Sequence, residues 1–237
     1  MRQLLIASMA PVLWILTVLD GFFIRRMFLQ YAQKKRAISL IVAVMCIGLF
    51  YDSLCLALGA FLKESAALRF FSQFRYIFHL TMIPLIFPIC AYSLKAKAGV
   101  RKAVWCIAVI IMVIGLAAGI LIKTEPRTVG AITRYAEAEG NPGWIDGIVS
   151  FLDMFPVFLM IGVGIFLFRK KNPNMFLAGF FMLLFTLLGI FLGKDPSGDR
   201  AKSLMFYISM FGEGLMVYFL WRFTEKEEDR EETAEQN

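Results

Sequence analysis

The sequence is poor in the residues that build most catalytic and metal centres. Its 237 residues include one histidine and four cysteines, and only 18% of them are charged. A single histidine excludes histidine-rich metal hydrolase sites, and no GxSxG, HExxH or paired acidic metal motif is present. The cysteines lie in apolar runs without CxxC spacing, which favours roles as buried hydrophobic residues over zinc ligation or disulfides.

Apolar residues dominate the rest of the chain. They make up 59% of it, and the mean hydropathy is +0.69. A soluble domain of this size needs more polar surface. Here the charged residues gather between long uncharged runs, which is typical of a membrane protein. No gap between the runs is long enough for another folded domain, so we expect a single membrane domain over residues 1–222.

A membrane-spanning helix needs about 20 predominantly apolar residues. Seven stretches reach that length, so the sequence predicts an all-α, polytopic membrane protein with a seven-transmembrane-helix bundle. The first stretch is not followed by a small-residue cleavage site and runs on to Arg25, so we interpret it as a span rather than a signal peptide. The expected spans are residues 4–24, 38–62, 69–94, 103–122, 147–168, 174–193 and 203–222.

Lysines and arginines are unevenly shared between the loops that would join these spans. The first, third and fifth loops hold twelve of them, whereas the second, fourth and sixth hold eight. Basic loops favour the cytoplasmic side of a membrane. We therefore expect a multi-pass protein of the cell membrane, with its N-terminus outside and its C-terminus in the cytoplasm.

The last residues, 223–237, form a separate acidic segment. They contribute −5 to the net charge of +7, which leaves +12 on the membrane domain. We expect a disordered cytoplasmic tail that extends the last helix by no more than a turn or two. The basic loops suit membrane lipids as partners, and they lack the interleaved aromatics of a nucleic-acid-binding surface. The oligomeric state is not indicated.

The longest connection covers residues 123–146 and is predicted to be extracytoplasmic. Its middle favours a short helix near Val129–Glu139, which the turn-forming cluster at residues 140–143 would end. Trp144 follows where an interfacial aromatic would anchor the next span. A loop of this length is either a lid over an outward-facing cavity or a simple connector, and the sequence leaves both open.

Five polar side chains lie at similar depth inside the expected spans. At a rise of about 1.5 Å per residue, Asp52, His79 and Glu213 lie about 15 Å from the outer ends of their helices. Arg75 and Asp153 lie about 9 Å from that edge by the same rise. A charge at the centre of the bilayer costs at least about 2.5–3.5 kcal/mol. These groups should therefore face inward, where they form a candidate ligand-binding or proton-binding cluster.

Arg75 needs a carboxylate partner, because its guanidinium cannot lose its proton in a protein. Asp153 matches it in depth, and a long arginine side chain also brings Asp52 or Glu213 within reach. A pair between Arg75 and Asp153 could equally serve only to fix the register of two helices. The residues alone do not choose between these roles.

The other polar groups also have local explanations. His79 could donate to a backbone carbonyl left free near Pro84, a residue that is expected to kink its helix. Glu213 stands between two glycines, which permit close helix approach and a hydrogen bond between helices. Asp20 lies near the cytoplasmic end of its expected span, where its side chain could reach toward the interface beside Arg25.

Two segments resemble microbial rhodopsins. Arg75 and Tyr76 form an Arg-Tyr pair, and Pro84 follows nine residues after the arginine, as in the third helix of that family. Residues 212–215 are similar to the glycine-containing stretch that follows the retinal lysine in the seventh helix. The resemblance covers about one and a half helices, and it implies a similar seven-helix arrangement.

The same alignment departs from the family at its cofactor. Met210 stands where the Schiff-base lysine would be, and Phe78 stands where the carboxylate counter-ion would be. The sixth span also lacks the family's tryptophans. We therefore expect no retinal attached through a lysine, no other cofactor is indicated, and no functional residue is carried over.

Three functions fit these observations. The first is a receptor-like or transporter-like protein that binds a small anionic or lipidic ligand through Arg75, while His79 and Glu213 exchange protons. The second is an intramembrane enzyme that acts on a lipid or isoprenoid, with His79 as general acid or base. The third is a structural or assembly subunit whose polar groups only join helices. The absence of a catalytic motif argues against the second function and keeps the third open.

Overall fold

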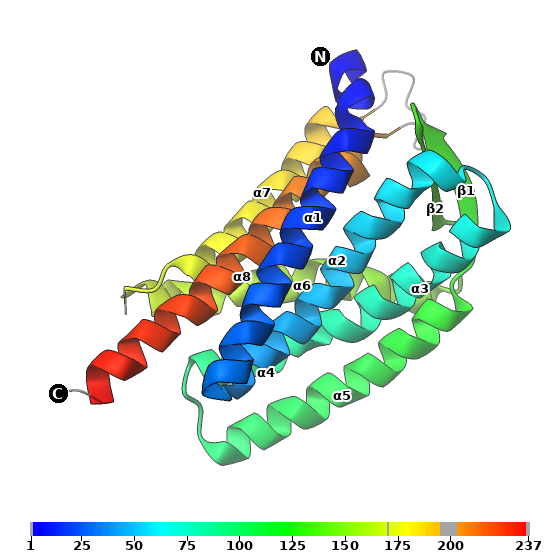
Figure 1. Ribbon diagram of the computed structural model, residues 1–237. Coiled ribbons are helices and arrows are strands. Elements are labelled where there is room, and N and C mark those ends of the chain that lie inside the picture. Colours follow the sequence, from blue (N-terminus) through cyan, green and yellow to red (C-terminus); the bar gives the residue numbers. More distant parts are fainter. Residues whose placement is uncertain (1, 170, 195–202, 236–237) are drawn as a thin grey trace.

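The computed structural model describes residues 2–169, 171–194 and 203–235, with side chains up to Glu227. Helices dominate, and a two-stranded antiparallel hairpin joins α5 to α6. In Figure 1 the start of α1 and the hairpin lie at one end of the bundle, and the end of α8 lies at the other. The elements are α1 (Arg2–Lys34), α2 (Ala37–Leu62), α3 (Ala66–Met82), the 3-10 turn η1 (Ile83–Leu85), α4 (Ile86–Ser93), α5 (Ala98–Leu121), β1 (Thr124–Val129), β2 (Ile132–Glu137), α6 (Gly143–Arg169), α7 (Asn174–Leu192) and α8 (Met205–Glu235).

Six helical segments among the described residues are long and apolar enough to cross a membrane. They are α1, α2, the combined segment Ala66–Ser93, α5, α6 and α7. Large apolar side chains remain exposed on their outer faces, such as Ile110 at 60% and Val113 at 62% on α5. An exposed apolar face of this kind suits contact with lipid. The structure thus supports a multi-pass membrane protein.

A seventh long helix, α8, packs against α1 and α7. It buries Tyr207, Val217 and Leu220 completely or nearly so. The helix continues to Glu235, further into the acidic segment than the turn or two expected from the sequence. Lys170, Arg200 and Lys202, which entered the count of basic loop residues, lie outside the described residues.

The third span is interrupted near its proline, as the sequence predicted. α3 ends at Met82, η1 contains Pro84, and α4 resumes at Ile86. Proline lacks the N–H group that would continue the helical hydrogen-bond ladder. The break lies one turn after His79, and it therefore sets the direction of the chain directly beside the polar cluster.

The prediction of a helix near Val129–Glu139 is wrong, because this segment forms the β1–β2 hairpin. Val129 pairs with Ile132 across a two-residue turn. Gly130 is the first residue of that turn and has a positive φ of +59°. A glycine at the first central position suits the tight turns of hairpins, and β-branched residues on both sides favour strands. The hairpin packs on α2, where Gly59 leaves room for the Thr133 carbonyl. The residues at the turn therefore signalled a hairpin, and the helical interpretation overlooked them.

Three of the cysteines are buried, as expected, whereas Cys106 is exposed on α5. Its neighbours Ile107 and Val109 are also about half exposed, at 51% and 49%. Cys106 therefore lies on the lipid-facing side of its helix rather than in the core.

Candidate functional site

All five polar residues singled out from the sequence line one cavity of about 140 Å³. α2, α3, α6 and α8 each contribute at least one of these side chains, and β2 adds Glu137. The cavity can hold several water molecules, but it is smaller than the roughly 300 Å³ or more of most small-molecule pockets. The charged lining consists of Asp52, Arg75, His79, Glu137, Asp153 and Glu213.

Asp52 is the centre of this cluster. One of its carboxylate oxygens lies 2.9 Å from Arg75 Nε, and the other lies 3.2 Å from His79 Nδ1. The Asp52 and Arg75 side chains are only 11% and 12% exposed. Arg75 thus pairs with Asp52, and the pairing with Asp153 suggested by matched depth is not formed. Arg75 has a second contact, because its guanidinium carbon lies over the ring of Tyr76, 4.8 Å from the ring centroid.

His79 lies between two carboxylates. Its Nε2 atom is 3.7 Å from Asp153 on α6, opposite the contact that Nδ1 makes with Asp52. The imidazole therefore lies in charge contact with both α2 and α6, although its Nδ1 atom makes no hydrogen bond in this geometry, and it is not bonded to a carbonyl near Pro84. The Asp153 side chain is 54% exposed, so this end of the Asp52–His79–Asp153 row opens to the surroundings.

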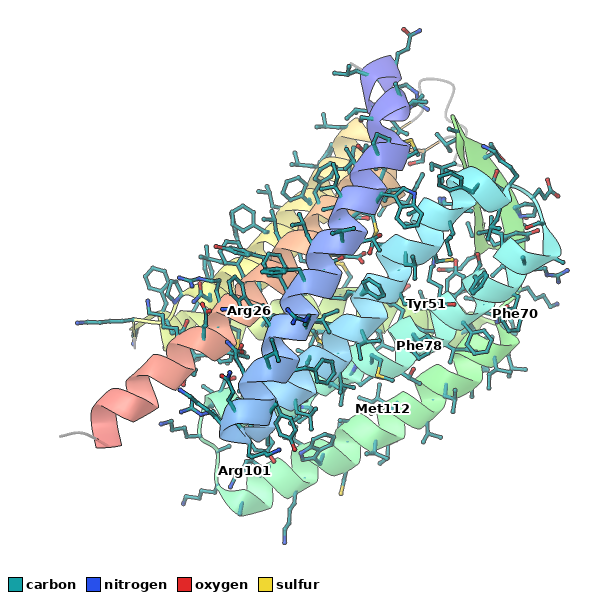
Figure 2. All side chains as sticks on the ribbon, viewed as in Figure 1. Arg26, Tyr51, Phe70, Phe78, Arg101 and Met112 are labelled. Atoms are coloured by element: carbon teal, nitrogen blue, oxygen red, sulfur yellow. The ribbon has the colours of Figure 1, made fainter. Side chains whose placement is uncertain are left out.

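An aromatic contact fixes α2 and α3 beside these ion pairs. Figure 2 shows Tyr51 and Phe78 close together between the two helices, and their ring centroids are 5.0 Å apart. Each ring precedes a member of the cluster in sequence, Asp52 on α2 and His79 on α3. The contact therefore helps to set the distance between the carboxylate and the imidazole.

Glu213 reaches the cavity from α8 and is only 8% exposed. Its Oε2 atom has no hydrogen-bond partner among the residues that the structure describes. The flanking glycines let two other helices approach, because Gly212 faces Met182 of α7 and Gly214 faces Leu16 of α1. Glu213 is thus a tightly packed carboxyl with unused hydrogen-bonding capacity, which is costly unless a proton, water or ligand is bound.

Asp20 does not reach toward the interface beside Arg25, contrary to the prediction. It is 2% exposed, and the Ser53 hydroxyl donates to its Oδ2 atom at 3.2 Å. Thr17 donates in turn to Ser53 at 3.3 Å. The physical reason is the length of α1, which continues to Lys34 and leaves Asp20 about 21 Å from its end. Asp20 therefore belongs to the buried layer next to Glu213.

The hairpin supplies two charged groups that the sequence did not single out. Glu137 lines the cavity, and burial followed by the nearby charge of Asp153 raises the pKa of its carboxyl above the usual value. Arg134 lies over the Phe206 ring at 4.2 Å. Burial, followed by the charge of Arg75, lowers the pKa of Arg134 to about 10. Polar residues are ordinary in a loop, so the sequence held no signal that these two face inward.

No group of three or more histidine, cysteine or acidic side chains is placed to hold a metal ion in the part of the chain that the structure describes. The cluster is instead built from the contacts of Asp52 with Arg75 and His79 and of His79 with Asp153. Neither a protein-family model nor a curated protein sequence matches this chain.

Proposed function

We propose that this protein binds a small ligand in its membrane-embedded cavity and couples that binding or transport to proton exchange. The observation that carries the proposal is the row Asp52–His79–Asp153, with distances of 3.2 and 3.7 Å. It leads from a buried carboxylate to a half-exposed one. Histidine is the side chain best suited to exchange protons near neutral pH. Ionisable groups inside membranes commonly mark such pathways.

The size and charge of the cavity restrict its ligand. Four carboxyl groups line it against Arg75 and His79, and Arg75 already pairs with Asp52 at 2.9 Å. The excess of acidic groups favours protons, water and a small cationic or neutral polar ligand. The small anionic ligand expected from Arg75 alone would require protonated carboxyls beside it.

The hairpin acts as a lid in this proposal. Glu137 closes one side of the cavity, and the Tyr76 hydroxyl donates to the backbone carbonyl of Tyr135 at 3.5 Å. The base of the hairpin is clamped by Asn141, whose amide donates to the carbonyls of Lys123 and Ala138 at 3.2 and 3.1 Å. Opening would have to expose Val129 and Ile132, which are buried at the tip, and would keep this base.

We further propose that α8 is the seventh span of a cell-membrane protein. The N-terminus and the hairpin would then be extracytoplasmic, and the acidic end of α8 would be cytoplasmic, in line with the distribution of basic residues. A helix arrangement like that of the microbial rhodopsins remains part of this proposal. Its cofactor does not, because Met210 stands where the retinal lysine would be.

An intramembrane enzyme is the second candidate. A histidine that lies between a buried carboxylate and a half-exposed one has the arrangement of a general base. The contact of His79 with both Asp52 and Asp153 provides it. The substrate would be a lipid or isoprenoid that reaches His79 from the side of Asp153.

Thermal unfolding of the purified protein tests these proposals. Wild type, Glu213→Gln and the control Glu139→Gln would be compared across pH with a panel of small cations, polar solutes and lipids. Glu139 is exposed in the turn that follows β2 and does not line the cavity. A ligand-dependent shift that is lost only in Glu213→Gln supports the binding proposal. In a separate activity assay, turnover of a lipid by wild type that is lost in His79→Gln supports the enzyme. A uniform loss of stability without any ligand response contradicts both and favours a structural subunit.

A further inference from the structure

A buried polar layer lies between α1, α2 and α8, next to the cavity. α1 packs against both of the other helices, and Figure 1 shows it lying between them. Asp20 is the acidic side chain of this layer and is 2% exposed. Thr17 and Ser53 provide its hydroxyl groups and are also buried. None of these three residues lines the cavity, so the layer adjoins the candidate site without belonging to its lining.

Asp20 and Glu213 each have a buried oxygen atom without a hydrogen-bond partner among the described residues. These atoms are Oδ1 of Asp20 and Oε2 of Glu213. Asp20 lies against α8 beside Glu213, since a Cβ on the next residue, Gly214, would lie 3.8 Å from Asp20 Oδ1. Asp20 is also among the charges that act on the Glu213 carboxyl. The contact between α1 and α8 therefore holds two buried carboxyl groups that influence each other.

The charged neighbours of these two carboxyls are already engaged elsewhere. Arg75 and His79 both contact Asp52, at 2.9 and 3.2 Å. α7, which also packs on α8, has no ionisable side chain. Two buried carboxylates without a cation of their own repel each other, so ionising both at once is costly. The charged and titratable groups that face the two carboxyls are Asp52 and Cys46 of α2 and Arg75 and His79 of α3.

The two hydroxyl groups suit Asp20 in both of its protonation states. The Ser53 hydroxyl lies 3.2 Å from Asp20 Oδ2 and 3.0 Å from the Phe50 carbonyl. The Thr17 hydroxyl lies 3.3 Å from Ser53 and 2.8 Å from the Leu13 carbonyl. Each hydroxyl has one hydrogen to donate. Beside an ionised Asp20, Thr17 donates to Ser53 and Ser53 donates to the carboxylate. Beside a neutral Asp20, both hydroxyls can turn to the backbone carbonyls, so neither state leaves a hydroxyl without an acceptor.

We propose that Asp20 and Glu213 form a proton-binding pair, which holds one exchangeable proton between its two carboxyls. When the O–H bond of Glu213 breaks, an O–H bond forms on Asp20, and Glu213 becomes the carboxylate. The pair keeps a single negative charge throughout. This inference rests on the proposed function, because it continues the path of protons from the cavity through Glu213 to α1.

Infrared spectroscopy of the full chain in lipid vesicles tests the pair, because the C=O stretch of a protonated carboxyl is separate from the bands of a carboxylate. Wild type, Asp20→Asn, Glu213→Gln and the double variant would be compared across pH. The control Asp146→Asn removes an exposed aspartate in the first turn of α6. We expect each single variant to shift the band of the pair, and the double variant to lose it. The control should leave the band unchanged.

Ser53→Ala provides a second test that keeps both carboxyls. It removes the donor to Asp20 Oδ2 and should shift the band of the pair, whereas Ser150→Ala removes an exposed serine of α6 and should not.

Three results would overturn the proposal. The first is a band that Asp20→Asn or Ser53→Ala leaves unchanged. The second is a pair of separate bands, each deleted by one single variant without effect on the other, because the two carboxyls would then titrate independently. The third is a band that responds to sodium but not to potassium at constant pH, because a metal ion would then be the occupant. The readout needs neither proton flux nor a ligand, so it separates a failure of this pair from a failure of the proposed function.

Discussion

Replacing Asp52 with asparagine removes the shared partner of Arg75 and His79 while keeping the size of the side chain. The Arg75 guanidinium, whose side chain is 12% exposed, would keep its charge without the carboxylate 2.9 Å away. Removing one partner of a buried ion pair costs about 3–5 kcal/mol. Since folded proteins are stable by only about 5–15 kcal/mol, Asp52→Asn should lose a large part of the free energy of unfolding.

Asp153→Asn is the matched control, because it removes a carboxylate from the other side of the same imidazole. Asp153 is 54% exposed and lies 3.7 Å from His79, so its contribution should stay below about 1 kcal/mol. The assay is denaturant unfolding in bicelles, which gives a free energy for each variant. Asp52→Asn/Arg75→Gln should be more stable than Asp52→Asn alone, because no unpaired guanidinium remains. Equal losses in the two single variants, or a double variant less stable than Asp52→Asn, would refute this reasoning.

Three further predictions concern packing, pH and the hairpin. Gly119→Leu should destabilise the protein by more than about 2 kcal/mol in the same assay, because a Cβ there would lie 2.8 Å from the α3 backbone. A Cβ at the exposed Gly99 has no atom within 4 Å, so Gly99→Leu should have little effect. Because the pKa of Glu137 is raised in the folded state, the folded protein holds this proton more tightly than the unfolded chain. Protonation of Glu137 therefore stabilises the fold fully below the unfolded pKa of about 4.3, and this stabilisation is lost as pH rises through the folded pKa. Glu137→Gln should flatten the dependence of unfolding temperature on pH in that window, and an unchanged slope would contradict the assignment. Asn141→Ala should speed amide hydrogen exchange over residues 124–137, because it removes the clamp at the hairpin base; unchanged exchange there would show that the clamp is not needed.

The gathering of polar side chains in one cavity follows from a simple constraint. Charges within apolar runs cannot face lipid cheaply, so their similar depth already indicated a common layer. Their pairing did not follow, because depth along a helix leaves its rotation and tilt undetermined. Arg75 and Asp153 match in depth, yet Asp52 on the facing side of α2 forms the pair.

The errors have equally local causes. The apolar run stops near residue 24 and so predicts a helix end close to Asp20, whereas the helix continues to Lys34. The helical interpretation of this segment fails at Gly130, which forms the turn between two β-branched flanks. The inward orientation of Glu137 and Arg134 has a different cause. Polar side chains in a loop normally face water, and only the packing of the hairpin on α2 and α3 turns them inward.

Proton movement across proteoliposomes tests the central claim most directly. Wild type, His79→Gln, Glu213→Gln and the control Glu139→Gln would be reconstituted with an internal pH dye, and proton flux would be driven by an imposed membrane potential with and without the ligand found by thermal shift. The account predicts flux in wild type and in Glu139→Gln and its loss in the two cavity variants, all four being folded. The same flux in all four proteins, or none above empty vesicles under any condition, would contradict a proton-exchanging cavity.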